Sequence, residues 1–174
     1  LTTSFCFDIH IEKFEDILPI LVKENENLDL EIVVNDWGIF QTIKECGCKF
    51  NLVLGRLLTR QKKDPRLNSS IENLDDDKKN KFKQVPCELY EDYLIENGFT
   101  AIELENTTCG ISYNGKLPVN LHFPFVLLST SSKCIINGKV SKNSNGNCKK
   151  ECLSDCLILE NESFDRKLYF NGNS

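Results

Sequence analysis

Short apolar runs and amphipathic stretches alternate along the first two thirds of the chain. Apolar residues recur at helical spacing over residues 11–25 and again over 37–45, which predicts two amphipathic helices. A third, shorter helix is expected over 88–97, ended by Gly98. The compact apolar runs, a pattern typical of buried strands, are residues 1–7, 30–34, 50–54, 99–104, 117–123 and 125–129. Apolar strands separated by helices indicate a parallel sheet that is covered by helices.

The predicted fold is a single α/β domain over residues 1–174, with a parallel sheet and covering helices that resemble an incomplete TIM barrel. A complete eight-stranded barrel usually needs about 250 residues, which is more than this chain contains. The chain has 174 residues and no Met, so we interpret it as a fragment of a longer protein.

Several stretches are expected to be turns or loops. The polar stretch 67–84 is expected to form a long loop. The sequence Tyr-Asn-Gly at 113–115 is typical of a hairpin-like turn. The part of the chain after Cys134 is loop-rich and cysteine-containing, and its expected short strands are residues 156–159 and 167–170.

Polar residues follow the apolar strands at the points where the strands end. These residues are Asn35, Asp36, Arg56, Glu103, Glu105 and His122. Because ligands of parallel α/β proteins bind at the carboxyl ends of the strands, these side chains are expected to line one mouth. The simpler alternative is that polar residues resume wherever a strand ends. The candidate catalytic residues are Asn35, Asp36, Arg56 and His122.

A basic run follows the predicted strand at 50–54. Its members are Arg56, Arg60, Lys62, Lys63 and Arg66. The planar arginine fork suits a carboxylate or a phosphate. A solvated loop explains the same residues without any ligand.

Charge and composition exclude some classes of function. A net charge of -5 argues against a surface that binds DNA through its phosphates. No apolar run approaches the roughly 18 residues of a membrane helix, and no signal peptide is visible. The nine cysteines are odd in number and unevenly spaced, which favours a reducing, cytoplasmic compartment. The glycosylation sequons at Asn68, Asn106 and Asn161 are therefore interpreted as chance matches.

Four of the nine cysteines lie close together in the last third of the chain: Cys134, Cys148, Cys152 and Cys156. Thiolates in this number suit either a zinc ion or an iron–sulfur cluster. Zinc sites usually use closely spaced pairs of cysteines or added histidines, and the chain has two histidines. An iron–sulfur cluster is therefore the first candidate and zinc the alternative. Free thiols packed as small apolar residues are the interpretation without a metal.

The strings VVNDWG (33–38), LVLGRLLTRQKKDPR (52–66) and LHFPF (121–125) resemble the collagenase-like peptidases, peptidase family "U thirty-two". They are most similar to the branch that includes the V-type protein of oxygen-independent ubiquinone biosynthesis. This resemblance implies a barrel-like α/β fold and a 4Fe-4S cluster. The ligands that it implies are Cys134, Cys148 and Cys152, with either Cys156 or a residue outside this chain as the fourth.

Three functional hypotheses follow from these patterns. The first is an iron–sulfur component of an oxygen-independent hydroxylation system, acting on a small molecule or an RNA base. The second is a collagenase-like peptidase that grips a peptide with Asn35, Asp36, Arg56 and His122. The third is a non-catalytic subunit that pairs with another member of the same family. The sequence has neither the serine-hydrolase elbow nor the HExxH zinc motif, so no peptidase mechanism is evident.

Overall fold

The computed structural model describes residues 1–6, 8–64, 66, 68–130, 157–159 and 168–170. The chain divides into two compact units, which are described separately. The first unit comprises residues 1–62 and 75–126, and the second comprises residues 63–74 and 127–174.

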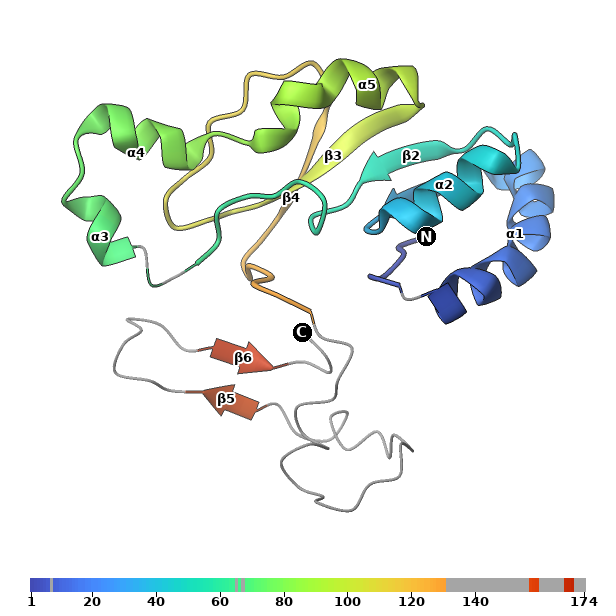
Figure 1. The fold of residues 1–174 in the computed structure, drawn as a ribbon, viewed down its shortest axis with the longest axis horizontal. Helices are drawn as coiled ribbons and strands as arrows, with labels where there is room; N and C mark the ends of the chain where they lie inside the picture. Colours follow the sequence, from blue (N-terminus) through green and yellow to red (C-terminus); the bar gives the residue numbers. More distant parts are fainter. Residues whose placement is uncertain (7, 65, 67, 131–156, 160–167, 171–174) are drawn as a thin grey trace. The chain divides into compact units, whose positions relative to one another are not determined.

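The first unit contains a four-stranded sheet in the order β1-β2-β3-β4 (Figure 1). The strands are β1 (Glu31–Val34), β2 (Asn51–Leu54), β3 (Phe99–Glu105) and β4 (Val119–His122). All three neighbouring pairs are parallel, and the strands follow one another in chain order. The parallel α/β architecture expected from the sequence is confirmed. The expected strand at 1–7 is present only as one parallel bridge between Thr2 and Val33.

With one exception, the helices of the first unit bury residues against the same face of the sheet. They are α1 (Asp8–Leu28), α2 (Trp37–Glu45), α4 (Asp76–Lys83), the 3-10 helix η2 (Pro86–Tyr90) and α5 (Glu91–Glu96), and only α4 buries none of its own residues. The main core joins Phe14 of α1, Phe40 of α2 and Leu94 of α5 to strand residues such as Ile102 and Leu104. No helix within the described ranges is long and apolar enough to cross a membrane.

The opposite face of the sheet carries a smaller apolar cluster and the acidic residues of β3. Val33, Val53 and Ala101 form the cluster. Because successive strand residues point to opposite faces, Glu103 and Glu105 share this face with Ala101, while Ile102 and Leu104 face the helices. Strand β4 adds its own polar residues here, since Asn120 pairs with Glu103 and His122 pairs with Glu105 in the parallel register. The sheet therefore separates an apolar, helix-covered face from a face with charged residues at one end.

The expected loop at 67–84 is wrong, because the structure has two helices there, α3 (Asn68–Glu72) in the second unit and α4 in the first. Helix α4 has no apolar buried face, and its stabilisation is polar. Asp75 caps its first turn by accepting a hydrogen bond from the amide of Lys78 at 2.9 Å. Acidic residues in the first turn and lysines in the last turn complement the helix dipole.

The expected hairpin-like turn at 113–115 is also wrong, because β3 and β4 are parallel. The connection between them is held instead by the carboxylate of Glu91 from α5. Glu91 accepts hydrogen bonds from the hydroxyl of Tyr113, from the amide of Lys116 at 2.7 Å and from the amide of Leu117 at 2.8 Å. A buried side chain thus takes over the role that backbone pairing has in a hairpin.

The described elements of the second unit are α3, β5 (Leu157–Leu159) and β6 (Leu168–Phe170). The two strands pair antiparallel, with Ile158 opposite Tyr169. The two short strands expected in the last part of the chain are confirmed.

Because of its hydrogen bonds, the negative charge of Glu91 contributes to the stability of the fold. Burial alone would raise the pKa of Glu91, but the hydrogen bonds from Tyr113, Leu117 and Lys116 outweigh it and lower that pKa. A carboxyl whose pKa is lower in the folded state contributes stability above its unfolded pKa. This contribution is lost as the pH falls through the folded value.

We predict that Glu91→Gln lowers the free energy of unfolding at pH 7 by about 1–3 kcal/mol, because an amide cannot accept all three hydrogen bonds. The deficit shrinks as the pH falls through the lowered folded-state pKa of Glu91, because the wild-type carboxyl then becomes neutral as well. Urea unfolding followed by Trp37 fluorescence at several pH values measures both effects.

The neighbouring Asp92→Asn is the matched control. Asp92 forms an exposed ion pair with Lys116 at 2.6 Å, so its loss destabilises the fold much less than the loss of the Glu91 carboxylate. An equal effect of the two substitutions, or a Glu91→Gln deficit that persists at low pH, contradicts this interpretation.

Candidate functional site: a charged cluster at the carboxyl edge of the sheet

The carboxyl ends of β2, β3 and β4 bring four charged or titratable side chains together. We call them the carboxyl-edge cluster, and its members are Arg56, Glu103, Glu105 and His122. The Nη1 atom of Arg56 lies 3.4 Å from Oε1 of Glu105 and 3.4 Å from Nδ1 of His122. The Nε2 atom of His122 lies 3.1 Å from Oε1 of Glu103. The amide of Arg56 donates to Oε2 of Glu103 at 3.3 Å, which closes the network.

The partners of His122 determine which neutral tautomer the geometry supports. An arginine guanidinium has donors but no acceptor, so Nδ1 of His122 must accept from Arg56. The proton of the neutral ring is then on Nε2, where it donates to the carboxylate of Glu103. His122 is therefore both oriented and polarised by its two charged neighbours.

Burial divides the cluster into an inner and an outer layer. The side chains of Glu105 and Glu103 are 0% and 10% exposed, whereas those of Arg56 and His122 are 32% and 33% exposed. A molecule arriving from solvent would meet the guanidinium and the imidazole first, with the carboxylates behind them. This arrangement can hold an anionic or carbonyl oxygen on Arg56 and can move a proton through His122.

The end of β3 is also held by Gln61, which follows β2 in the chain. The Gln61 side chain accepts a hydrogen bond from the amide of Glu105 at 2.7 Å and donates one to its carbonyl at 3.1 Å. Gln61 is not among the residues predicted from the sequence, and Glu103 and Glu105 were predicted only as polar residues at a strand end. The available signal was the pair of glutamates two positions apart at the end of a mostly apolar strand, which puts both carboxylates on one face.

Asn35, a predicted catalytic residue, holds backbone at the strand ends. Its side chain is buried, donates to the carbonyl of Thr3 at 3.0 Å and accepts from the amide of Leu57 at 3.1 Å. It also packs on Gly55, where an added Cβ would lie 2.2 Å from Oδ1 of Asn35. Asn35 therefore positions the turn that carries Arg56.

Asp36, the other predicted residue after β1, caps helix α2. Its Oδ1 accepts hydrogen bonds from the amides of Gly38 at 2.7 Å and Ile39 at 3.3 Å, and its Oδ2 accepts one from the amide of Cys6 at 3.4 Å. Of the four predicted catalytic residues, the structure brings Arg56 and His122 into contact and gives Asn35 and Asp36 backbone partners.

The predicted metal ligands Cys134, Cys148, Cys152 and Cys156 lie outside the described residues. Within the described part, Cys6, Cys46, Cys48 and Cys87 are free thiols. No group of three or more histidine, cysteine or acidic side chains among the described residues is placed to hold a metal ion.

The basic run, for which the sequence left an anion site and a solvated loop open, is distributed over several surroundings. Arg56 belongs to the carboxyl-edge cluster, and Lys62 lies over the ring of Phe82 at 4.8 Å. Arg66 forms an exposed ion pair with Asp64 at 2.6 Å. The run is therefore not one anion site in this structure.

The structure is that of a parallel α/β protein in which Arg56, Glu103, Glu105 and His122 contact one another at the carboxyl edge of the sheet. Comparison of the chain with protein-family models, curated proteins and solved structures finds no match.

We predict energetic coupling between Arg56 and Glu105. Arg56→Met costs about 2 kcal/mol of stability, because it removes the cation beside a fully buried carboxylate, with a discount for the partly exposed arginine. In the Arg56→Met/Glu105→Gln double variant, part of this loss is recovered, which gives a coupling energy of about 1–2 kcal/mol. Urea unfolding of the unaltered protein, the two single variants and the double variant measures the coupling. Additive losses would show that the contact does not contribute.

Proposed function

We propose that the chain is an iron–sulfur protein of the collagenase-like peptidase kind. In this proposal it binds its substrate at the carboxyl-edge cluster and takes part in an oxygen-independent hydroxylation. The observation that carries the proposal is that the three sequence strings behind the resemblance meet in space at one edge of the sheet.

The contacts between the strings are direct hydrogen bonds. Asn35 of the VVNDWG string accepts from the amide of Leu57 in the LVLGRLLTRQ string at 3.1 Å. Arg56 of the second string lies 3.4 Å from the ring of His122 in the LHFPF string. Gln61, also in the second string, bonds the end of β3 between them. These contacts place the three strings at the carboxyl ends of the strands, where parallel α/β proteins bind ligands.

The order of the strands supports a barrel-like architecture as part of the proposal. Parallel strands that neighbour one another in chain order, with helices on one face, have the connectivity of a segment of a (β/α) barrel. The face with Glu103, Glu105 and His122 would then be the inner face. The carboxyl-edge cluster would lie at the catalytic mouth of such a barrel.

Each member of the cluster has a chemical role in this proposal. Arg56 binds an oxygen of the substrate, and His122 donates or removes a proton at that group. Glu103 orients His122 through the Nε2 contact, and Glu105 holds the guanidinium of Arg56 in place. Asn35 and Asp36 act through the backbone that carries these side chains.

The donor set for the metal centre comes from the cysteine cluster of the sequence. Cys134, Cys148, Cys152 and Cys156 together offer the number of thiolates that a 4Fe-4S cluster takes, and zinc is the alternative metal. A bound iron–sulfur cluster would supply electron transfer. Thiolate ligands need a reducing compartment, so a cytoplasmic location is part of the proposal, as is a paired subunit of the same kind.

A peptidase is the second candidate, and the Glu103–His122 contact favours it. A histidine oriented by a carboxylate is a common general base in hydrolysis. In that case the carboxyl-edge cluster would bind the peptide carbonyl through Arg56. The cysteines would then be structural.

We predict that protein purified without oxygen contains about four irons and four acid-labile sulfides per chain and a broad visible absorption shoulder. Cys148→Ala removes the iron and the shoulder, because it deletes a thiolate ligand. The control is Cys46→Ala, which removes an exposed thiol outside the cysteine cluster and leaves the iron content unchanged.

Equal iron loss in both variants, or zinc in place of iron, contradicts the iron–sulfur proposal. Peptide cleavage by metal-free protein that is abolished by His122→Ala would instead establish the second candidate.

A further inference from the structure

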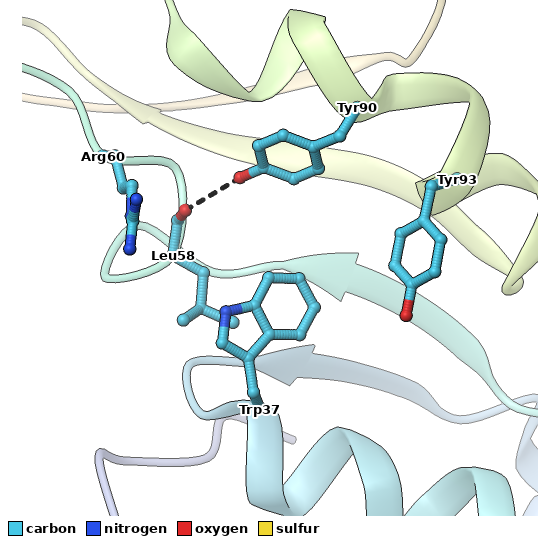
Figure 2. A pocket seen from close by; sticks show the side chains of 5 residues that line it. All are labelled: Trp37, Leu58, Arg60, Tyr90 and Tyr93. Carbon is cyan, nitrogen blue, oxygen red and sulfur yellow. Dashed lines mark hydrogen bonds between the residues drawn. The ribbon is translucent and has the colours of Figure 1, made fainter.

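A pocket of about 300 Å³ lies on the helix-covered side of the first unit (Figure 2). Its lining residues are Trp37, Leu58, Arg60, Tyr90 and Tyr93. The indole of Trp37 and the two tyrosine rings form an aromatic side, and Arg60 comes from the loop that carries Leu58. This volume is at the lower end of the range for ligand pockets, which suits a small molecule.

Two contacts hold the walls of the pocket in place. Trp37 is the first residue of α2, and its ring meets Phe40 edge-on at 5.8 Å and Phe99 at 6.5 Å between centroids. The residue is nevertheless 39% exposed, so part of the indole surface is open to a ligand. On the opposite wall, the hydroxyl of Tyr90 donates to the carbonyl of Leu58 at 3.2 Å, which ties the helical wall to the Arg60 loop.

The charge of the pocket comes from Arg60 alone. The lining has no carboxylate, and no carboxylate of the described residues forms an ion pair with Arg60. Burial raises the pKa of Tyr90 to about 12, with Cys87 adding to the shift and Arg60 opposing it, so this phenol is neutral at pH 7. The φ angle of Arg60 is 55°, a left-handed conformation that is uncommon for arginine and sets the direction of this residue.

We propose that this pocket binds a small aromatic carboxylate, with its ring against Trp37 and the tyrosines and its carboxylate on Arg60. An aromatic pocket without a cation would favour ammonium groups through their attraction to the ring faces. The unpaired guanidinium reverses that preference and offers a planar, two-pronged partner for a carboxylate. The pocket does not use the carboxyl-edge cluster, so this inference is independent of the proposed function.

Trp37 makes the proposal directly measurable, because it is the chain's only tryptophan. Benzoate is the probe, benzamide removes the charge, and cyclohexanecarboxylate removes the aromatic ring. We expect benzoate to quench the Trp37 fluorescence in a saturable manner. Benzamide, which lacks the charge, and cyclohexanecarboxylate, which lacks the aromatic ring, should both bind more weakly than benzoate. The loss of the charge weakens binding by about tenfold.

Substitution of Arg60 separates pocket binding from general quenching. Arg60→Gln weakens benzoate binding by about tenfold and leaves benzamide binding unchanged. Arg60 is exposed, so the fold is retained, which circular dichroism checks. Arg66→Gln is the matched control, since Arg66 lies in the same basic run and pairs with Asp64, and it leaves benzoate binding unchanged.

Calorimetry provides a readout that does not depend on the indole. Trp37→Leu, which keeps an apolar side chain at the start of α2, abolishes the heat of benzoate binding. Quenching that does not saturate, equal binding of benzoate and benzamide, or equal effects of Arg60→Gln and Arg66→Gln would each overturn the proposal.

Discussion

The position of the Arg56 guanidinium between Glu105 and His122 is the interaction on which the carboxyl edge of the sheet depends. Glu105 ends the central strand β3 with a side chain that is 0% exposed, and a carboxylate so placed is costly without a cation close by. Arg56 supplies that cation from the turn after β2 and reaches His122 at the end of β4. One side chain thus links the ends of three neighbouring strands.

The alternation of residues along β3 explains how one sheet carries two different surfaces. Ile102 and Leu104 face the helices, while Glu103 and Glu105 point to the other side. The loop after β2 serves both sides, because Arg56 joins the acidic residues and Arg60, four positions on, lines the aromatic pocket. A short connection therefore places two arginines in electrostatically different surroundings.

Local sequence patterns predicted a helix or strand well where a local signal, such as a cap or an apolar repeat, determines that element. Helix α2 has the predicted bounds, because Asp36 caps it and its apolar residues recur on one face. Helix α4 was missed because Phe82 is its only apolar residue, and the helix is stabilised by its cap and charges. Turn residues at 113–115 could not reveal that β3 and β4 are parallel, since strand order depends on distant packing. Likewise, the strand-end position of Asn35 was visible in the sequence, but its backbone partners, Thr3 and Leu57, come from other segments.

The tautomer of His122 tests the carboxyl-edge cluster most directly. Nitrogen-15 NMR of the histidine side chains distinguishes the two ring nitrogens, and the spectrum of His10→Gln, which removes the chain's other histidine, assigns the signals. At a pH where the ring is neutral, the geometry requires a proton on Nε2 and none on Nδ1, because Nδ1 faces the Arg56 guanidinium and Nε2 faces the Glu103 carboxylate. A proton on Nε2 of His122 in the unaltered protein is the predicted result, and a proton on Nδ1 would contradict the cluster.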